Sequence, residues 1–119
     1  MKSRSGKRKR LEDNRWSVFT EDLEHCYFCE KKASDVHEII YGSNRWNSMR
    51  YGYVLPLCRT HHDMFHRNYR LTMEWQVRCQ EHFMKKDTLA KWVEIFHCNY
   101  KEKLKQKYEH KSNLEEERL

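Results

Sequence analysis

The sequence lacks any apolar run that approaches the ~18 residues needed to span a bilayer, so we expect no transmembrane segment and no membrane partner. Its first residues are basic and contain no apolar stretch of signal-peptide length. Five cysteines are an odd number, and together with that start they argue against a secreted disulfide framework and favour a reducing cytoplasm. We find no internal repeat, and 119 residues allow one small domain with tails.

Two Cys/His pairs have the spacing of a structural zinc site. Cys26 and Cys29 form a Cys-x-x-Cys pair, and Cys58 and His61 form a Cys-x-x-His pair. A two-residue gap lets a tight turn direct two donors at one tetrahedral ion. A domain this small also buries a modest core, so a metal ion that joins distant parts of the chain is expected on stability grounds. The sequence therefore predicts structural Zn²⁺ at these four residues.

Further potential ligands lie between and just beyond these pairs. His37 and Glu38 are adjacent, and His62 and His66 are four residues apart, which places both on one face of a helix. Since four ligands complete the zinc site, the surplus predicts a second metal site of a different kind. Three imidazoles would leave coordination positions open for substrate and water, as a catalytic site requires.

The chain between the two Cys/His pairs predicts two strands. Residues 36–40 and 51–55 are rich in β-favouring side chains. The first run ends at Gly42, and Pro56 bounds the second. We interpret the two runs as a hairpin with a long, polar loop.

Helices are predicted after this hairpin. One begins at Thr60 or His61, and apolar stripes predict a second over residues 71–83 and, after Asp87 as N-cap, a third over 89–104. The fold class is therefore α+β. The expected organisation is a disordered basic arm over residues 1–13, a zinc-stabilised domain over 14–104, and a charged tail or frayed helix over 105–119.

Positive charge is concentrated at the start of the chain. Residues 1–10 contain six of the 24 Lys and Arg residues and no acid, whereas the other 109 residues carry 18 basic and 18 acidic side chains. A mobile cationic arm on a neutral body can grip the phosphate backbone of DNA without reading its sequence. A solubilising terminus and a nuclear localisation signal are the alternatives. The basic residues of this arm are Lys2, Arg4, Lys7, Arg8, Lys9 and Arg10.

The order strand, loop, strand, helix, with histidines near the first strand's end and at the helix start, resembles the ββα-metal core of HNH endonucleases. Within that family it looks like the small phage-encoded branch with a Cys/His zinc knuckle. The resemblance covers Cys26 to about Phe83, and its most specific parts are VHEIIYG at 36–42 and LCRTHH at 57–62. It implies hydrolysis of DNA phosphodiester bonds with one divalent ion, Mg²⁺, Mn²⁺ or Zn²⁺, in a bacterial or phage-infected cell.

By this resemblance, His37, His62 and His66 hold the catalytic ion. The family usually has a catalytic histidine directly after the first ligand, and here that position is Glu38, which we take as the general base. In an alternative frame, Asp35 and His37, which share one strand face, are ligand and base respectively.

The family's central asparagine is displaced in this sequence. Tyr53 occupies its usual place, and the candidates for its role are Asn44 and Asn47 in the loop. Asn44, which we prefer, also suits a plain turn position beside Gly42. Two loop arginines, Arg45 and Arg50, are candidate phosphate contacts, with a solvated surface as the alternative reading.

Two other function classes remain open from the sequence. The departures at Glu38 and at the asparagine position would also suit a non-catalytic zinc module that binds nucleic acid or protein. A small phage adaptor is a third possibility, in which the C-terminal helices engage a phage or host protein. The oligomeric state is not predicted.

Overall fold

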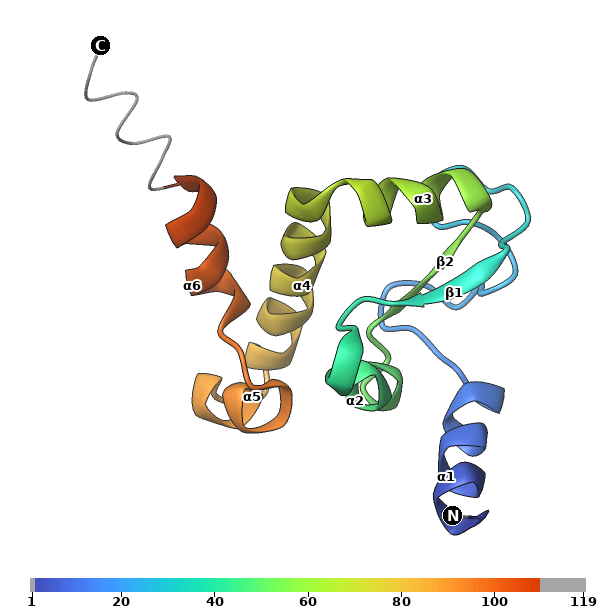
Figure 1. Cartoon of the computed structure of the whole chain (residues 1–119), viewed down its shortest axis with the longest axis horizontal. Coiled ribbons are helices and arrows are strands. Elements are labelled where there is room, and N and C mark those ends of the chain that lie inside the picture. Colours follow the sequence, from blue (N-terminus) through green and yellow to red (C-terminus); the bar gives the residue numbers. More distant parts are fainter. Residues whose placement is uncertain (1, 110–119) are drawn as a thin grey trace. The chain divides into compact units, whose positions relative to one another are not determined.

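The computed structural model describes residues 2–109 (Figure 1). The chain divides into two compact units, Met1–Arg67 and Asn68–Leu119. The described residues form helices and one two-stranded antiparallel sheet, which confirms the predicted α+β class. Residues 110–119 of the expected C-terminal tail lie outside the described part of the chain, and the expected domain boundaries stay predictions.

The first unit is organised around the predicted hairpin. Strand β1, Asp35–Glu38, pairs with strand β2, Val54–Leu57, in a register that places His37 opposite Leu55. Every residue of β2 is buried, because it is the apolar strand of the pair. The two-stranded antiparallel pairing is confirmed, although both strands are displaced along the chain from the predicted runs.

Pro56 lies inside β2 and does not end it, contrary to the sequence prediction. A proline has no backbone N–H to donate, so it is tolerated where a strand has a free edge, as in a sheet of two strands. Its carbonyl oxygen accepts a hydrogen bond from the Tyr27 N–H at 2.9 Å. This bond ties the first Cys/His knuckle to the sheet.

The connection between the strands contains a 3₁₀ turn, η1 (Gly42–Asn44), and helix α2 (Arg45–Arg50), where the sequence predicts a polar loop. Ser48 on α2 is fully buried. Its hydroxyl accepts from the Ile40 N–H at 3.1 Å and donates to the Tyr53 carbonyl at 2.6 Å. One serine therefore holds the two ends of the connection together.

Two further helices belong to the first unit. Helix α3, Arg59–Arg67, begins one to two residues before the predicted start. It carries His61 of the second Cys/His pair, and Cys58 directly precedes it. The basic start of the chain forms helix α1, Lys2–Asp13, which differs from the disordered arm expected there. Lys and Arg are good helix formers, and this segment contains no proline to stop a helix.

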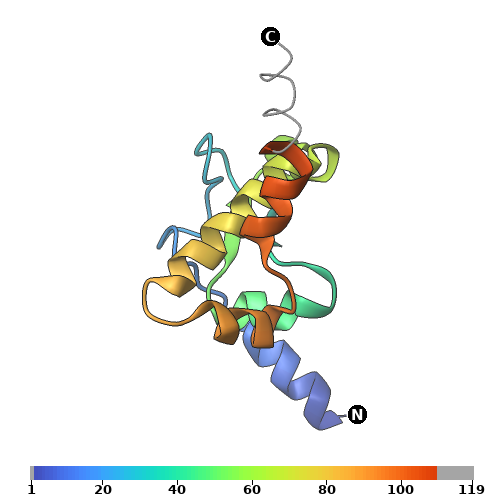
Figure 2. The same ribbon diagram turned by 90° about the vertical axis from the view of Figure 1, so that its left-hand side faces the viewer.

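The second unit is helical. Helix α4 spans Tyr69–Met84, α5 spans Leu89–Phe96, and α6 spans Tyr100–Leu104, followed by a π-helical turn at Lys105–Glu109. Helices α4 and α6 pack side by side, as Figures 1 and 2 both show. None of the helices within residues 2–109 combines the length and apolarity needed to cross a membrane.

The core of the second unit follows the predicted stripes only in part. Cys79 is fully buried on α4, as predicted. On α5, however, the buried residues are Trp92 and Phe96, whereas Val93 from the predicted stripe is exposed. The N-cap of α5 is Thr88, whose side chain accepts from the backbone N–H three residues on, and not the predicted Asp87.

Candidate metal sites and the face of strand β1

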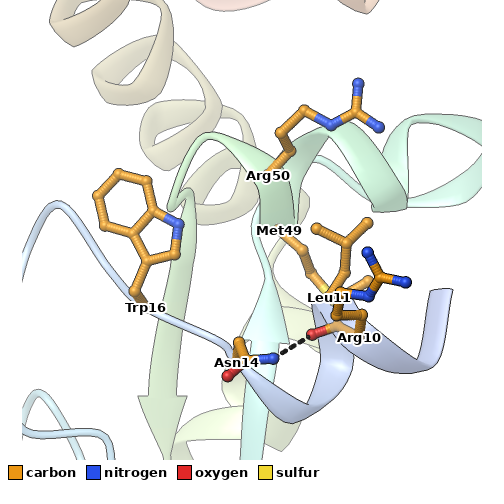
Figure 3. A pocket seen from close by; sticks show the side chains of 6 residues that line it. All are labelled: Arg10, Leu11, Asn14, Trp16, Met49 and Arg50. Carbon is orange, nitrogen blue, oxygen red and sulfur yellow. Dashed lines mark hydrogen bonds between the residues drawn. The ribbon is translucent and has the colours of Figure 1, made fainter. Parts of the chain in front are cut away.

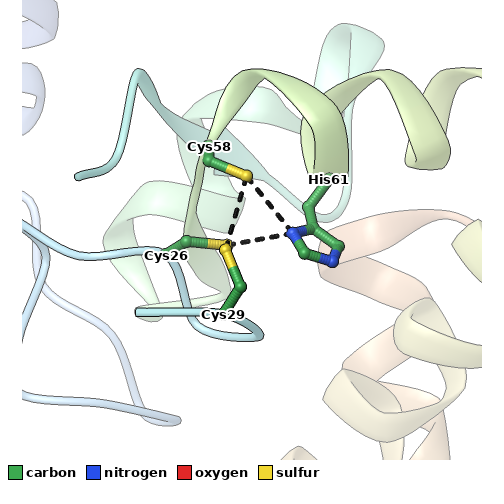
Figure 4. A group of neighbouring side chains, drawn as sticks. All are labelled: Cys26, Cys29, Cys58 and His61. Carbon is green, nitrogen blue, oxygen red and sulfur yellow. Dashed lines mark hydrogen bonds between the residues drawn. The ribbon is translucent and has the colours of Figure 1, made fainter. Parts of the chain in front are cut away.

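Four side chains from two parts of the chain converge on one point (Figure 4). Cys26 and Cys29 lie in the loop before β1, Cys58 directly follows β2, and His61 is in the first turn of α3. Their ligand atoms all lie within 4.8 Å of one another. The Sγ atoms of Cys29 and Cys58 are 3.7 Å apart. With Zn–S bonds of about 2.3 Å, the edge of a tetrahedron is about 3.8 Å, so the predicted ligands lie together and could bind a metal such as zinc.

The loop that carries the first two cysteines is closed by its own backbone. The Cys26 N–H donates to the Lys31 carbonyl at 2.6 Å, and the Glu30 N–H donates to the Cys26 carbonyl at 3.1 Å. Glu30 has a φ of 64°, in the left-handed region, which turns the chain sharply after Cys29. These bonds aim both sulfurs toward the start of α3.

Cys26 and Cys29 in this cluster have shifted acidities. Burial raises the pKa of the Cys26 thiol, but the backbone N–H groups of Cys58, Phe28 and Cys29 outweigh burial and bring it to about 6 from its ordinary value of 9.0. The Lys31 N–H lowers the pKa of Cys29, yet burial and the Cys58 and Cys26 thiols together raise it above its ordinary value. Cys26 is therefore the more readily ionised of these two thiols.

A second cluster consists of three histidines. The Nε2 atoms of His62 and His66, one helical turn apart on α3, are 3.2 Å from each other. The ring of His37 on β1 is centred 5.3 Å from that of His62 and 6.2 Å from that of His66. The structure therefore brings together the three histidines that the sequence assigns to an open site, although their nitrogens are less tightly gathered than the four knuckle ligands.

His37 is the most unusual member of this cluster. Burial, and then the charges of His62 and His66, lower its pKa from 6.5 to about 4, against an opposing effect of Asp35. Its ring is therefore neutral near neutral pH. The Nε2 atom is buried and has no hydrogen-bond partner within the part of the chain that the structure describes. A neutral imidazole with an unused buried nitrogen is what a metal ion requires of a histidine ligand.

Asp35 orients the histidine cluster from the same strand face. Residues two apart on a strand point to the same side, so Asp35 and His37 both face α3. Asp35 Oδ2 lies 3.1 Å from His62 Nδ1. A carboxylate on one ring nitrogen fixes a histidine's tautomer and leaves the other nitrogen, here Nε2, to act as a ligand.

Glu38 lies on the opposite face of β1 from His37 and is held by two arginines. Its Oε1 atom accepts from Arg45 Nε at 2.6 Å, and its Oε2 atom accepts from Arg15 Nη2 at 3.4 Å. Only 13% of the glutamate side chain is exposed. Glu12 on α1 extends the network, because it also binds Arg45, at 3.0 Å. The sequence analysis missed Arg15 and Glu12 as partners. Their only signal was a charge opposite to that of Glu38 or Arg45, which lie more than 20 residues later in the chain.

The remaining predicted residues are more dispersed. Asn44 is the last residue of η1, immediately before α2. Arg45 has two acidic partners, whereas Arg50, at the end of α2, is exposed. At the basic start of the chain, Lys9 and Arg10 are exposed, and the side chains of Lys7 and Arg8 lie outside the described ones.

Comparison with known families adds one result. A family model described as protein of unknown function (DUF968) matches residues 3–86, well over half of the chain. The chain belongs to this family. The DUF968 match includes both strands and α3, and it includes every residue of the Cys/His cluster and of the three-histidine cluster. No curated protein and no solved structure gave a significant match.

Proposed function

We propose that this DUF968 protein is a metal-dependent endonuclease of the HNH type that hydrolyses phosphodiester bonds in DNA. The observation that carries the proposal is the buried, unpartnered Nε2 of His37, on a ring centred 5.3 Å from that of His62, together with the 3.2 Å approach of the His62 and His66 Nε2 atoms. It gains support from the order β1, β2, α3, which is the order of elements in a ββα-metal core. The Cys/His knuckle beside this cluster matches the branch that the sequence resembles.

In this proposal His37, His62 and His66 hold one divalent ion, Mg²⁺, Mn²⁺ or Zn²⁺, and Asp35 orients His62 for that role. When bound, the ion would act as a Lewis acid on the scissile phosphate and stabilise the charge on the leaving oxygen. The low pKa of His37, about 4, keeps its ring neutral and able to serve as a ligand at neutral pH.

The proposed general base is Glu38, on the other face of β1 from His37. Within residues 2–109 β1 has one strand neighbour, so no strand covers its second edge. A phosphate across that edge would meet the ion on one side and the carboxylate on the other, as an in-line attack by water requires. A carboxylate offers about four lone pairs, so its bonds to Arg45 and Arg15 leave capacity to accept a proton. Asn44, the last residue of η1, keeps its proposed role in catalysis.

The structural zinc ion positions this site in the proposal. Cys58 and His61 fix the first turn of α3, and His62 is the next residue along the helix. Because the zinc ligands also come from the loop before β1, one ion would hold both α3 and the segment leading to β1. The histidines from β1 and α3 would then keep their spacing without relying on a large core.

Nicking of supercoiled plasmid by the purified protein tests the proposal. We expect nicking with added Mg²⁺, Mn²⁺ or Ni²⁺ and none after a mild chelation that removes the added ion but leaves the structural zinc. Zinc content measured on the same sample shows that the knuckle is intact. Absence of nicking with every one of these ions would overturn the proposal.

A non-catalytic zinc module that binds nucleic acid or protein is the second candidate. The observation that favours it is the pair of arginine bonds on Glu38, which engages both carboxylate oxygens. Metal stoichiometry separates the two functions. The module predicts one tightly bound zinc ion and no second binding event, whereas the nuclease predicts a second, weaker site that His62→Ala removes.

A further inference from the structure

A pocket of about 340 Å³ lies in the first unit, and none of its lining residues belongs to the Cys/His cluster or to the three-histidine cluster. Leu11 from α1, Met49 from α2 and Trp16 from the segment after α1 form its apolar lining. Arg10, Asn14 and Arg50 form its polar lining. In Figure 3 both guanidinium groups lie on the far side of the drawn residues from the indole of Trp16. Its volume is at the lower end of the range for small-ligand sites.

Trp16 presents a fixed aromatic face. A Cβ atom on Gly52 would lie 2.9 to 3.0 Å from three atoms spread over the six-membered ring of the indole, so that ring lies flat on the glycine. Trp16 is nevertheless 50% exposed, and it lines the pocket, so much of its surface away from Gly52 is accessible. The backbone beside it is anchored, because the Val18 N–H donates to Gly52 and the Ser17 hydroxyl donates to Val54. A large apolar surface is thus held rigidly in contact with solvent.

The two arginines of the pocket differ from the other two near it. Arg15 and Arg45 are neutralised by Glu12 and Glu38. Arg10 and Arg50 are both exposed, and no carboxylate of the described residues forms an ion pair with either side chain. Uncompensated arginines beside an open aromatic ring are suited to a ligand that has both a flat π-system and a negative charge.

We propose that this pocket binds one unpaired nucleotide of a DNA strand, with its base stacked on Trp16 and its adjacent phosphates bound by Arg10 and Arg50. The inference deepens the proposed function, and rests on it for the identity of the ligand as the substrate strand. It predicts that the preferred substrate carries an unpaired nucleotide near the cleavage position. Paired bases cannot enter, because their faces are covered by their neighbours in the stack.

The pocket and the histidine site lie near each other along the chain. Gly52, under Trp16, is three residues before Leu55, which pairs with His37. At ~3.3 Å per residue these three residues span at most about 10 Å, which is the length of about three nucleotides of a stacked strand.

Binding of fluorescent twelve-nucleotide oligothymidylate, measured by anisotropy without added divalent ion, tests this site independently of cleavage. Trp16→Ala should weaken binding by about 5- to 100-fold, the effect of one lost stacking contact, and change binding of a fully paired hairpin by less than about twofold. Arg50→Ala should reduce the log–log salt slope for oligothymidylate by about 0.7. Tyr41→Ala, which removes a comparably exposed aromatic ring outside the pocket, should have no effect.

A second variant covers the case in which Trp16→Ala does not fold. Oligothymidylate should quench the tryptophan fluorescence of the wild-type protein, and Trp16→Phe should retain binding but lose the quench. Equal weakening of hairpin and oligothymidylate binding by a folded Trp16→Ala, or a quench that persists in Trp16→Phe, would overturn the inference. Should the plasmid assay fail while these binding results hold, the nuclease proposal is wrong and the nucleotide site stands.

Discussion

The Nε2 atoms of His62 and His66 lie 3.2 Å apart on consecutive turns of α3. With metal–nitrogen bonds of about 2.1 Å, neighbouring ligands of one ion are separated by about 3.0 to 3.4 Å, so the pair already has the spacing of two ligands. His37 approaches the same point from β1, and the Asp35 carboxylate holds the other nitrogen of His62. The predictions below test the parts of this arrangement one at a time.

The zinc knuckle should be essential for folding of the first unit. Cys58→Ser removes one ligand, and a structural zinc ion can contribute several kcal/mol to a domain with a small core. We expect loss of both zinc and the cooperative thermal transition. Cys98→Ser, which alters a thiol of the second unit, is the matched control and should keep both. Cooperative melting of zinc-free Cys58→Ser would show that the knuckle is dispensable.

Acid should destabilise the protein through His37. Its folded pKa of about 4 lies below the ordinary 6.5, so between these values the unfolded chain binds more protons. The free energy of unfolding should therefore fall as the pH is lowered from about 6.5 to 4, by up to about 3 kcal/mol from this group. Denaturant titrations at pH 7 and pH 4.5, without added ions, should show a smaller fall for His37→Gln. Parallel falls in the two proteins would place the acid response elsewhere, since the knuckle responds equally in both.

Substitution of the two candidate acids should distinguish the two frames of the active site. Glu38→Gln keeps the side-chain size but cannot accept a proton, so turnover should fall by ~10²–10⁴ with little change in DNA binding. Asp35→Asn should have a smaller effect, because the amide can still contact His62. The reverse order, an active Glu38→Gln and an inactive Asp35→Asn, would identify Asp35 as a ligand and His37 as the base.

Gly52 and Gly42 provide a matched pair that isolates the Trp16 contact. Both have positive φ, 75° and 72°, so alanine at either position should cost about 1–2 kcal/mol in backbone strain. The room for a side chain differs between the two positions. A Cβ at Gly42 would meet nothing within 4 Å, whereas one at Gly52 would meet Trp16 at 2.9 Å. In thermal or denaturant unfolding, Gly52→Ala should therefore be the more destabilised variant. Equal destabilisation of the two would mean that Trp16 is not seated on Gly52.

The sequence predicted best what depends on local spacing. The zinc ligands follow from two pairs with the same two-residue gap, Cys26 with Cys29 and Cys58 with His61. The helix that brings His62 and His66 together follows from their four-residue separation. The antiparallel strands were found as apolar runs. The second strand extends past its predicted end because Pro56 is tolerated at the edge of a two-stranded sheet, which the sequence does not reveal.

Contacts between distant residues were not predictable. On helix α2 the buried Ser48 joins Ile40 to Tyr53, and nothing in the local sequence distinguishes this segment from a polar loop. From the sequence, Glu38 is predicted to be the general base without any partner being predicted for it. In the structure Arg15, 23 residues earlier in the chain, is one of its partners. The contact of Trp16 with Gly52, 36 residues later in the chain, likewise becomes apparent only in the fold.

Nicking of supercoiled plasmid by His62→Ala, compared with the wild type at saturating Mn²⁺, tests the central claim most directly. His82→Ala, which removes an exposed histidine from α4, serves as the matched control. If the histidine cluster is the catalytic site, His62→Ala should retain its zinc and its thermal transition but lose nicking, while His82→Ala nicks at the wild-type rate. Nicking by His62→Ala at the wild-type rate would contradict the account.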